Sequence, residues 1–142
     1  MIKTIATIFT LFIIGVVNTY AQTYIKPVGV SSADQGANSI IINQNGEYVI
    51  GGYVNDSSFI ALLDNNGLPI WSKSFDFSSN PDYIMELSLT SDNFIIGCGI
   101  SKLASGGQPN GFVFKVDMLG NLIWSKLINI GGNTVYAYGL NE

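Results

Sequence analysis

Asp82 and Glu86 are the carboxylates whose spacing comes nearest to an acid–base pair. Residues four apart in a β-strand lie on the same face, so two carboxylates at this spacing are placed to exchange protons with one substrate. Acidic residues that only solvate the edge of a strand have the same spacing. The sequence favours solvation, and we assign no catalytic residue.

Two oxygen-rich turns are candidates for calcium binding. They read NDSS from Asn55 to Ser58 and DNNG from Asp64 to Gly67, and Ca²⁺ takes such carboxylate, amide and carbonyl oxygens as ligands. An Asp that caps its own turn is the commoner use of these sequences. Asp34, Asp56 and Asp64 would have to meet to form a site, and the sequence does not bring them together. We assign no metal ligand.

The residue types that are missing exclude several kinds of catalytic site. The chain has no His and a single cysteine, Cys98. A Ser-His-Asp arrangement, a His-ligated metal and a thiolate zinc site are therefore excluded, as is a disulfide within the chain. In the apolar stretch FIIGCGI, Cys98 is expected to be a buried small residue. No cofactor is assigned.

The N-terminus has the order of a secretory signal peptide. Met1–Lys3 carries a positive charge, an apolar run extends from Ile5 to Val17, and the small residues Thr19 and Ala21 precede Gln22. The run is shorter than the roughly 20 residues that span a bilayer. Residues 1–21 are thus predicted to be a cleaved signal peptide, and an uncleaved anchor helix is the alternative.

The chain that follows is acidic, which limits its partners. Without Lys3, five lysines remain against ten acidic residues, a net charge of 5 − 10 = −5. Nucleic acids and anionic membrane surfaces attract basic patches, so neither is expected as a partner. The sequence predicts a secreted protein, located in the medium, on the cell surface or in the periplasm.

The periodicity of the remaining chain is that of β-strands joined by tight turns. Asn45-Gly46 separates two β-rich runs and predicts a hairpin, since both residues tolerate positive φ. Asp64–Gly67 and Asp117–Gly120 lie between further pairs of such runs. In each of these turns the Asp is expected to cap the backbone and the Gly to take the left-handed position.

The chain contains a repeat. FIALLDNNGLPIWSKSF (59–75) matches FVFKVDMLGNLIWSKLI (112–128), and Trp71 to Trp124 is a separation of 53 residues. Upstream, Tyr48 aligns with Phe94 and Gly51 with Gly97, a separation of 46. The difference of seven falls in a Gly-rich loop, where repeat folds tolerate insertions.

Each copy reads as four short strands, which predicts an all-β fold of four-stranded antiparallel β-propeller blades, about two and a third repeats in all. Runs such as Ile40–Ile42 and Phe94–Ile96 indicate strands packed on both faces, and Trp71 and Trp124 are expected to pack between blades. The predicted strands are 37–43, 47–53, 58–63 and 68–75, then 82–90, 93–100, 112–116 and 121–128. The domains are a signal peptide (1–21), a lead segment with a candidate closing strand (22–36), and repeats over 37–142, namely 37–75, 82–128 and the start of a third at 134–142.

The repeats resemble those of secreted bacterial β-propeller proteins of the quinoprotein-like and delta-60-like kind. Those repeats carry a GG strand, an aromatic strand that ends in Lys-x-Asp, then Gly and Trp; here these are Gly51-Gly52, Phe112–Asp117, Gly120 and Trp124. The first copy departs from the pattern with Leu62 in place of Lys115. The Asp-to-Gly turns are shorter than in quinoprotein dehydrogenases and lack their Thr, so a quinone cofactor is not implied. The bulb-type lectins are a weaker resemblance, because QNGEYVI keeps only Gln44 of their mannose signature.

A closed propeller has about four to eight blades, more than this sequence supplies. The chain is therefore interpreted as a fragment of a longer propeller; assembly with other chains, or a marginal open stack, are the alternatives. The function expected is that of a secreted non-catalytic scaffold or binding module with a protein or glycan ligand, not an enzyme. The alternative is part of a secreted propeller enzyme, a hydrolase or oxidoreductase, whose active site lies in missing blades.

Overall fold

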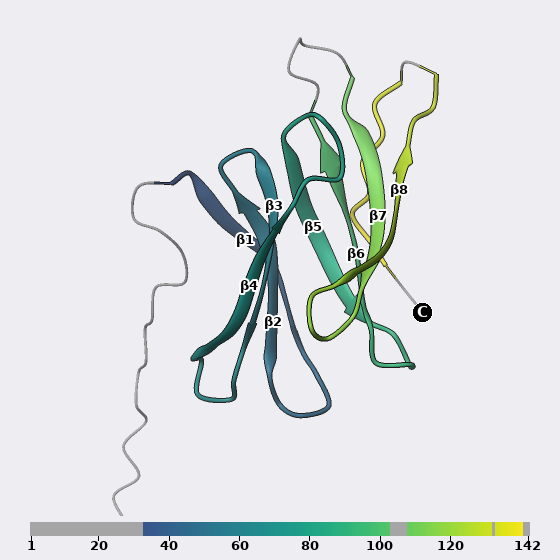
Figure 1. Ribbon diagram of the computed structural model, residues 1–142. Coiled ribbons are helices and arrows are strands. Elements are labelled where there is room, and N and C mark those ends of the chain that lie inside the picture. Colours follow the sequence, from purple (N-terminus) through teal and green to yellow (C-terminus); the bar gives the residue numbers. More distant parts are fainter. Residues whose placement is uncertain (1–32, 103–107, 132, 141–142) are drawn as a thin grey trace, which may run out of the picture.

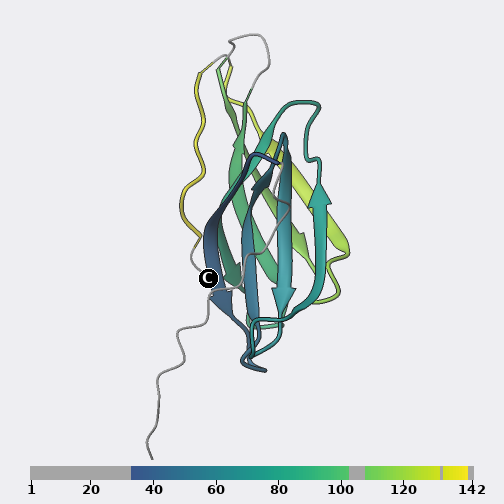
Figure 2. The ribbon, with the colours of Figure 1, turned by 90° about the vertical axis from the view of Figure 1, so that its left-hand side faces the viewer.

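The computed structural model describes residues 33–102, 108–131 and 133–140. The predicted signal peptide and most of the lead segment 22–36 lie outside these residues. The described part forms two four-stranded antiparallel sheets that pack face to face (Figures 1 and 2). The strands of the first sheet are β1 (Gln35–Ile42), β2 (Tyr48–Val54), β3 (Ser57–Leu63) and β4 (Pro69–Phe75); those of the second are β5 (Asp82–Leu89), β6 (Ile95–Ser101), β7 (Asn110–Val116) and β8 (Leu122–Ile128).

In both sheets the spatial order of the strands is their order in the sequence. The all-β prediction is confirmed, and the predicted strand boundaries agree with the observed ones to within two residues. None of the described residues belongs to a helix that could cross a bilayer.

The turns at one end of the molecule, the turn end, are capped by their own first side chain. Asp64 Oδ1 accepts hydrogen bonds from the backbone N–H groups of Asn66 (2.9 Å) and Leu68 (2.7 Å). Asp117 does the same in the second sheet. Gly67 and Gly120 follow with φ of 75° and 72°, a region that favours glycine. The predicted capping by Asp is confirmed.

The Asn45-Gly46 hairpin is also confirmed, but its turn differs from the expected one. Only Gly46 has positive φ, 77°, and the turn is closed further out, by Asn43 N–H donating to Glu47 O at 2.9 Å. The side chain of Asn43 caps it by accepting from Asn45 N–H and Glu47 N–H, each at 2.9 Å. A cap of the Asp64 type thus operates here with an amide oxygen.

The repeat offset of the first two strands is 47, and the predicted 46 is wrong. Asn93, with φ 61°, takes the place of Gly46, and Thr90 takes that of Asn43, since Thr90 N–H donates to Phe94 O at 2.9 Å. The β-bulges also recur at 47, between Ala37 and Ser39 and between Ile84 and Glu86. The alignment of Gly51 with Gly97 matched identical residues but not equivalent positions. For β3 and β4 the offset of 53 holds, including their bulges.

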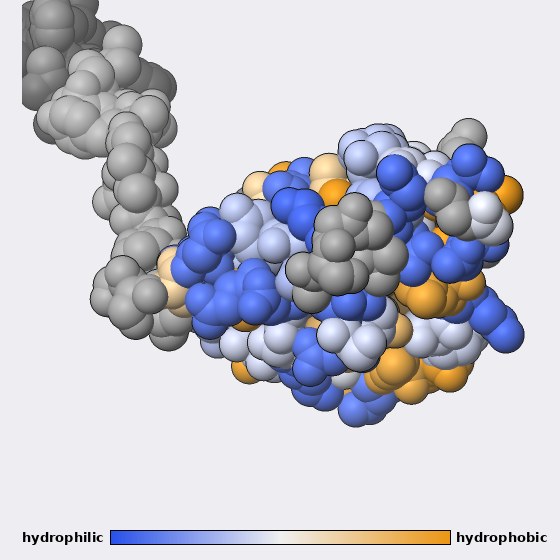
Figure 3. Space-filling model, turned by 90° about the horizontal axis from the view of Figure 1, so that it is seen from above, coloured by the Kyte–Doolittle hydropathy of each residue, from blue (hydrophilic) through white to orange (hydrophobic). Residues whose placement is uncertain are grey.

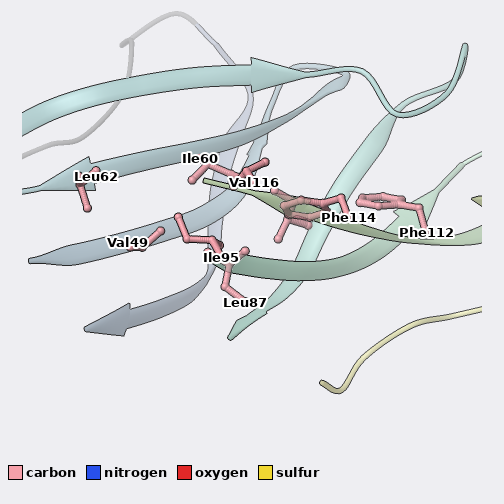
Figure 4. Packing of buried hydrophobic residues seen from close by; sticks show 9 residues of the cluster. Val49, Ile60, Leu62, Leu87, Ile95, Phe112, Phe114 and Val116 are labelled. Carbon is pink, nitrogen blue, oxygen red and sulfur yellow. The ribbon is translucent and has the colours of Figure 1, made fainter. Parts of the chain in front are cut away.

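The core lies between the two sheets. It consists of nine buried side chains from both sheets: Val49, Ile60, Leu62, Ile84, Leu87, Ile95, Phe112, Phe114 and Val116 (Figure 4). Gly51 allows the sheets to approach, because a Cβ there would lie 2.7 Å from Leu87 Cδ1. Burial of these apolar groups is the main force that joins the sheets.

Polar contacts fix how the sheets are aligned. The indole Nε1 of Trp71 donates to Met118 O at 3.1 Å, and Lys73 Nζ donates to Gly120 O at 2.9 Å. Where β1 lies against β5, Leu87 N–H donates to Ser39 Oγ at 3.0 Å. Trp71 therefore packs between the sheets, as the sequence predicted.

On their outer faces, the edge strands β1 and β8 do not follow the prediction of packing on both sides. Ile40 and Ile42 are 60% and 61% exposed on the first sheet. Trp124, expected between blades, is 37% exposed on the second. An apolar run shows that a strand is suited to burial, but not which neighbour covers it.

Candidate functional site

The end opposite the turn end, here called the crossover end, carries the connections between sheets and is the candidate functional site. It comprises residues 33–35, 53–57, 75–83, 101–102, 108–110 and 128–135, apart from 132. Figure 3 looks onto this end and shows a mainly hydrophilic surface, with hydrophobic residues gathered on the side of β8. The connections between strands differ in length at this end. β2 and β3 are joined by the two residues Asn55 and Asp56, whereas the connection between β6 and β7 runs from Lys102 to Pro109.

Asp82 organises the crossover between the sheets. Its side chain is fully buried, and Oδ2 accepts hydrogen bonds from Phe77 N–H at 2.7 Å and Ser78 N–H at 2.9 Å. Ser78 Oγ lies 2.9 Å from Asp82 Oδ1 and 2.6 Å from Ser101 Oγ. A buried carboxylate is costly unless it is hydrogen-bonded, and this network supplies the bonds. Asp82 therefore acts as a structural anchor of residues 76–81.

The predicted pairing of Asp82 with Glu86 on one face is wrong. Asp82 pairs with Ser101 and Glu86 with Cys98, and a β-bulge lies between Ile84 and Glu86. The extra residue shifts the alternation by one, so the two carboxylates lie on opposite faces of the sheet. At these positions the two carboxylates cannot act on one substrate.

The three aspartates considered for calcium are divided between the two ends. Asp34 and Asp56 lie at the crossover end, where Asp34 O accepts from Asn55 N–H. Asp64 caps a turn at the turn end, the full length of β3 away. Within the part of the chain that the structure describes, no three His, Cys, Asp or Glu side chains are grouped to hold a metal ion.

Two tyrosine rings and a lysine ammonium group lie together at the crossover end. The rings of Tyr53 and Tyr83 meet edge to face at 4.7 Å, and Lys102 Nζ lies 4.5 Å from the centre of the Tyr83 ring. Partial burial, followed by the charges of Asp56 and Asp34, raises the pKa of Tyr83 above its ordinary value. Tyr83 is therefore a neutral hydroxyl at physiological pH, next to two carboxylates.

Cys98 is buried, as the sequence predicted. Burial, with a smaller contribution from Glu86, raises the pKa of its thiol to about 11. Its Sγ donates to Ala137 O at 3.4 Å. A thiol with this pKa is not a nucleophile at neutral pH, because the thiolate is the reactive form.

Residues 134–140 begin with the same contact to the second sheet that β5 makes with the first. Val135 N–H donates to Pro109 O at 2.9 Å, and Asp82 N–H donates to Asp56 O at the same distance. Donor and acceptor of the second bond each precede those of the first by 53 residues. By this correspondence Asp82 and Glu86 are replaced by Val135 and Gly139. The acidic residues are thus not a repeated feature.

The sequence did not reveal the anchoring role of Asp82. Its partners Phe77 and Ser78 are in a segment without periodicity, and Ser101 is 19 residues further along the chain. The nearest signal was a Ser-rich stretch, SSNPD (78–82), that ends in an Asp directly before an apolar strand.

No model of a known protein family matches the chain, and no curated protein matches it. The repeated contacts and the composition of the crossover end are therefore the observations that bear on function.

Proposed function

We propose that the chain is a secreted, non-catalytic repeat protein of the β-propeller kind and that its crossover end binds an extracellular ligand. In this proposal each four-stranded sheet is one blade, residues 134–140 begin a third, and the chain is part of a larger propeller. The resemblance to secreted bacterial propeller repeats agrees with this interpretation.

The observation that carries the proposal is the recurrence of fine structure at fixed offsets. Turn caps, left-handed residues and bulges return after 47 residues in the first two strands and after 53 in the last two. The entry hydrogen bond to the next unit also returns, from Asp82 to Val135. Such recurrence is typical of repeat folds, in which each unit packs only on its neighbours.

The crossover end is proposed as the binding surface because it is the end at which the repeats differ. The turn end is built alike in both sheets and capped by side chains. At the crossover end the loops differ in length and expose polar side chains, and loops on a rigid scaffold are where binding residues concentrate. Tyr53 and Tyr83 beside the carboxylates of Asp34 and Asp56 combine aromatic surface with hydrogen-bond acceptors. These groups suit a glycan, and we take a glycan as the ligand.

The test is a glycan array probed with the exported chain, followed by titration calorimetry on the best glycan. Asp56→Ala at the crossover end is compared with Asn65→Ala, an exposed residue of the turn end. Loss of binding in Asp56→Ala alone supports the proposal. A ligand whose binding depends on Asn65, or no binding across the array, would overturn it; capture of a protein ligand at the same end would replace the glycan.

A further inference from the structure

The two outer faces of the molecule are the repeat equivalents of the two surfaces that already pack together inside it. At offsets of 47 and 53, the outer face of the first sheet corresponds to the buried face of the second. The corresponding pairs are Ile40 and Leu87, Ile42 and Leu89, Phe59 and Phe112, and Leu63 and Val116. Ile40 and Ile42 are exposed on this face, whereas Leu63 is buried. The first sheet therefore has on its outer face, exposed along β1, the kind of surface that the second sheet uses for the core.

The outer face of the second sheet corresponds in turn to the buried face of the first. Here the pairs are Val49 and Ile96, Ile60 and Val113, Trp71 and Trp124, and Lys73 and Lys126. Trp and Lys are identical in the two sheets, although only Trp71 and Lys73 have a sheet packed against them. Trp124 is 37% exposed, and Lys126 is exposed as well.

The hydrogen-bond donors that align the sheets recur on the second sheet as Trp124 and Lys126, and the acceptors recur in the turn between β3 and β4 of the first. Inside the molecule, Trp71 and Lys73 donate to the carbonyl oxygens of Met118 and Gly120, in the turn between β7 and β8. The same turn of the first sheet offers Asn65 O and Gly67 O at the equivalent positions. Its backbone is alike, since each turn is closed by the same bond from the Gly N–H to the Asp O, of 2.9 Å and 3.0 Å.

We propose that a second copy of this chain packs its first sheet on the outer face of the second sheet, head to tail. Trp124 and Lys126 of one copy then donate to Asn65 O and Gly67 O of the next. The core of the new interface is formed by Ile40 and its neighbours on the first sheet of the added copy.

Residues 134–140 lie where β1 of the added copy would run, because they hold the place that β5 holds on the first sheet. They are attached through Val135 N–H to Pro109 O and Cys98 Sγ to Ala137 O, with no strand ladder among the described residues. Packing of β1 therefore displaces this segment. The contact is heterologous, so copies add until the ring closes, at about four to eight sheets, which is two to four copies.

The experiment uses the full chain, expressed with its N-terminal segment for export and purified from the exported fraction. Sedimentation velocity over a wide range of concentration gives its mass. Ile42→Glu blocks the outer face of the first sheet, and Trp124→Glu blocks that of the second. Both residues are exposed, so neither change should unfold the protein, and circular dichroism checks this. Ile130→Glu, 60% exposed at the crossover end, is the matched control.

We expect wild type and Ile130→Glu to associate, and each blocked variant alone to be a monomer. An equimolar mixture of the two blocked variants should form a dimer and nothing larger, since each supplies the face that the other lacks. If either variant is unfolded, Ile40→Glu and Lys126→Glu provide the same test.

Two results would overturn the proposal. One is a wild-type chain that stays monomeric at every concentration. The other is a mixture of blocked variants that fails to pair, which would show that like faces meet, or that these faces do not meet at all. The proposal rests on the correspondence of the sheet faces and not on ligand binding, so Asp56→Ala should associate like wild type whether or not it binds a glycan.

Discussion

Trp71 and Trp124 occupy equivalent positions in the two sheets, so alanine at each gives a matched pair of perturbations. Trp71 is partly buried, packs against Gly120 and the core, and donates to Met118 O at 3.1 Å. Trp124 faces outward and is 37% exposed. The residue type and the strand position are equivalent. The cross-strand partner is Leu62 for Trp71 and Lys115 for Trp124, and only Trp71 has the other sheet packed on it.

The expected losses in the free energy of unfolding follow from this difference in packing. Replacing a core Trp by Ala costs about 3–5 kcal/mol, and we expect the lower end, about 3 kcal/mol, for Trp71→Ala because its ring is not fully buried. The lost hydrogen bond accounts for about 1 kcal/mol of this. Trp124→Ala should cost about 1 kcal/mol or less, as exposed substitutions do. The difference of about 2 kcal/mol corresponds to about a 30-fold ratio of the two unfolding constants.

Urea unfolding followed by far-ultraviolet circular dichroism measures both values, because this signal does not depend on the Trp that is removed. The m-value should stay unchanged, so that a shift of the midpoint reports stability alone. Each curve is taken at two low protein concentrations, since self-association would stabilise the folded state. Equal losses in the two variants, or a larger loss in Trp124→Ala, would refute the assignment of Trp71 as the covered member of the pair.

Three further predictions concern single residues. Asp82→Ala should lower the free energy of unfolding by about 3 kcal/mol, because it leaves the part-buried N–H groups of Phe77 and Ser78 without their acceptor; Asp76→Ala, an exposed control at the first residue of the same segment, should change it little, and equal effects in urea unfolding would contradict the anchor. Cys98 should not react with a thiol reagent at pH 8 until the protein unfolds, since burial raises the pKa of its thiol to about 11; rapid reaction of the native protein would show that residues 134–140 do not cover it. Hydrogen bonds, first from the backbone N–H of Asn121, lower the pKa of Asp117 in the folded state, so its contribution to stability is present above the unfolded pKa near 3.9 and is lost as pH falls through the folded pKa. Asp117→Asn should therefore lose less stability than wild type when the pH is lowered below about 4, and an unchanged pH profile of the melting temperature would count against this cap.

The strands and turns were predictable because their signals are local. Asp64 and Asp117 each precede a Gly by three residues between β-rich runs, and the cap needs only the chain between them. The repeat offset was less secure, because Gly51 and Gly97 are identical yet not equivalent. The true equivalent of Gly51 is Cys98, which keeps the small volume but not the residue type.

The bulge next to Met85 and the cover of the outer faces were not predictable from sequence. One extra residue in a strand leaves its composition and apolar content unchanged, but it moves Glu86 to the opposite face from Asp82. Similarly, Ile40 and Ile42 have the pattern of buried residues and are exposed. Their sequence specifies an apolar surface, whereas burial depends on a neighbouring sheet that the pattern does not identify.

The sequential order of strands within each sheet has a consequence for folding kinetics. Every ladder joins strands that are adjacent in the chain, and most are closed by a turn of a few residues, so each hairpin forms with a small loss of loop entropy. Contacts of this range favour rapid folding. The remaining barrier is the docking of one completed meander on the other, through residues such as Trp71 and Leu87. Substitutions at the docked faces should thus alter mainly the late step, whereas changes to the turn caps should alter the formation of single hairpins.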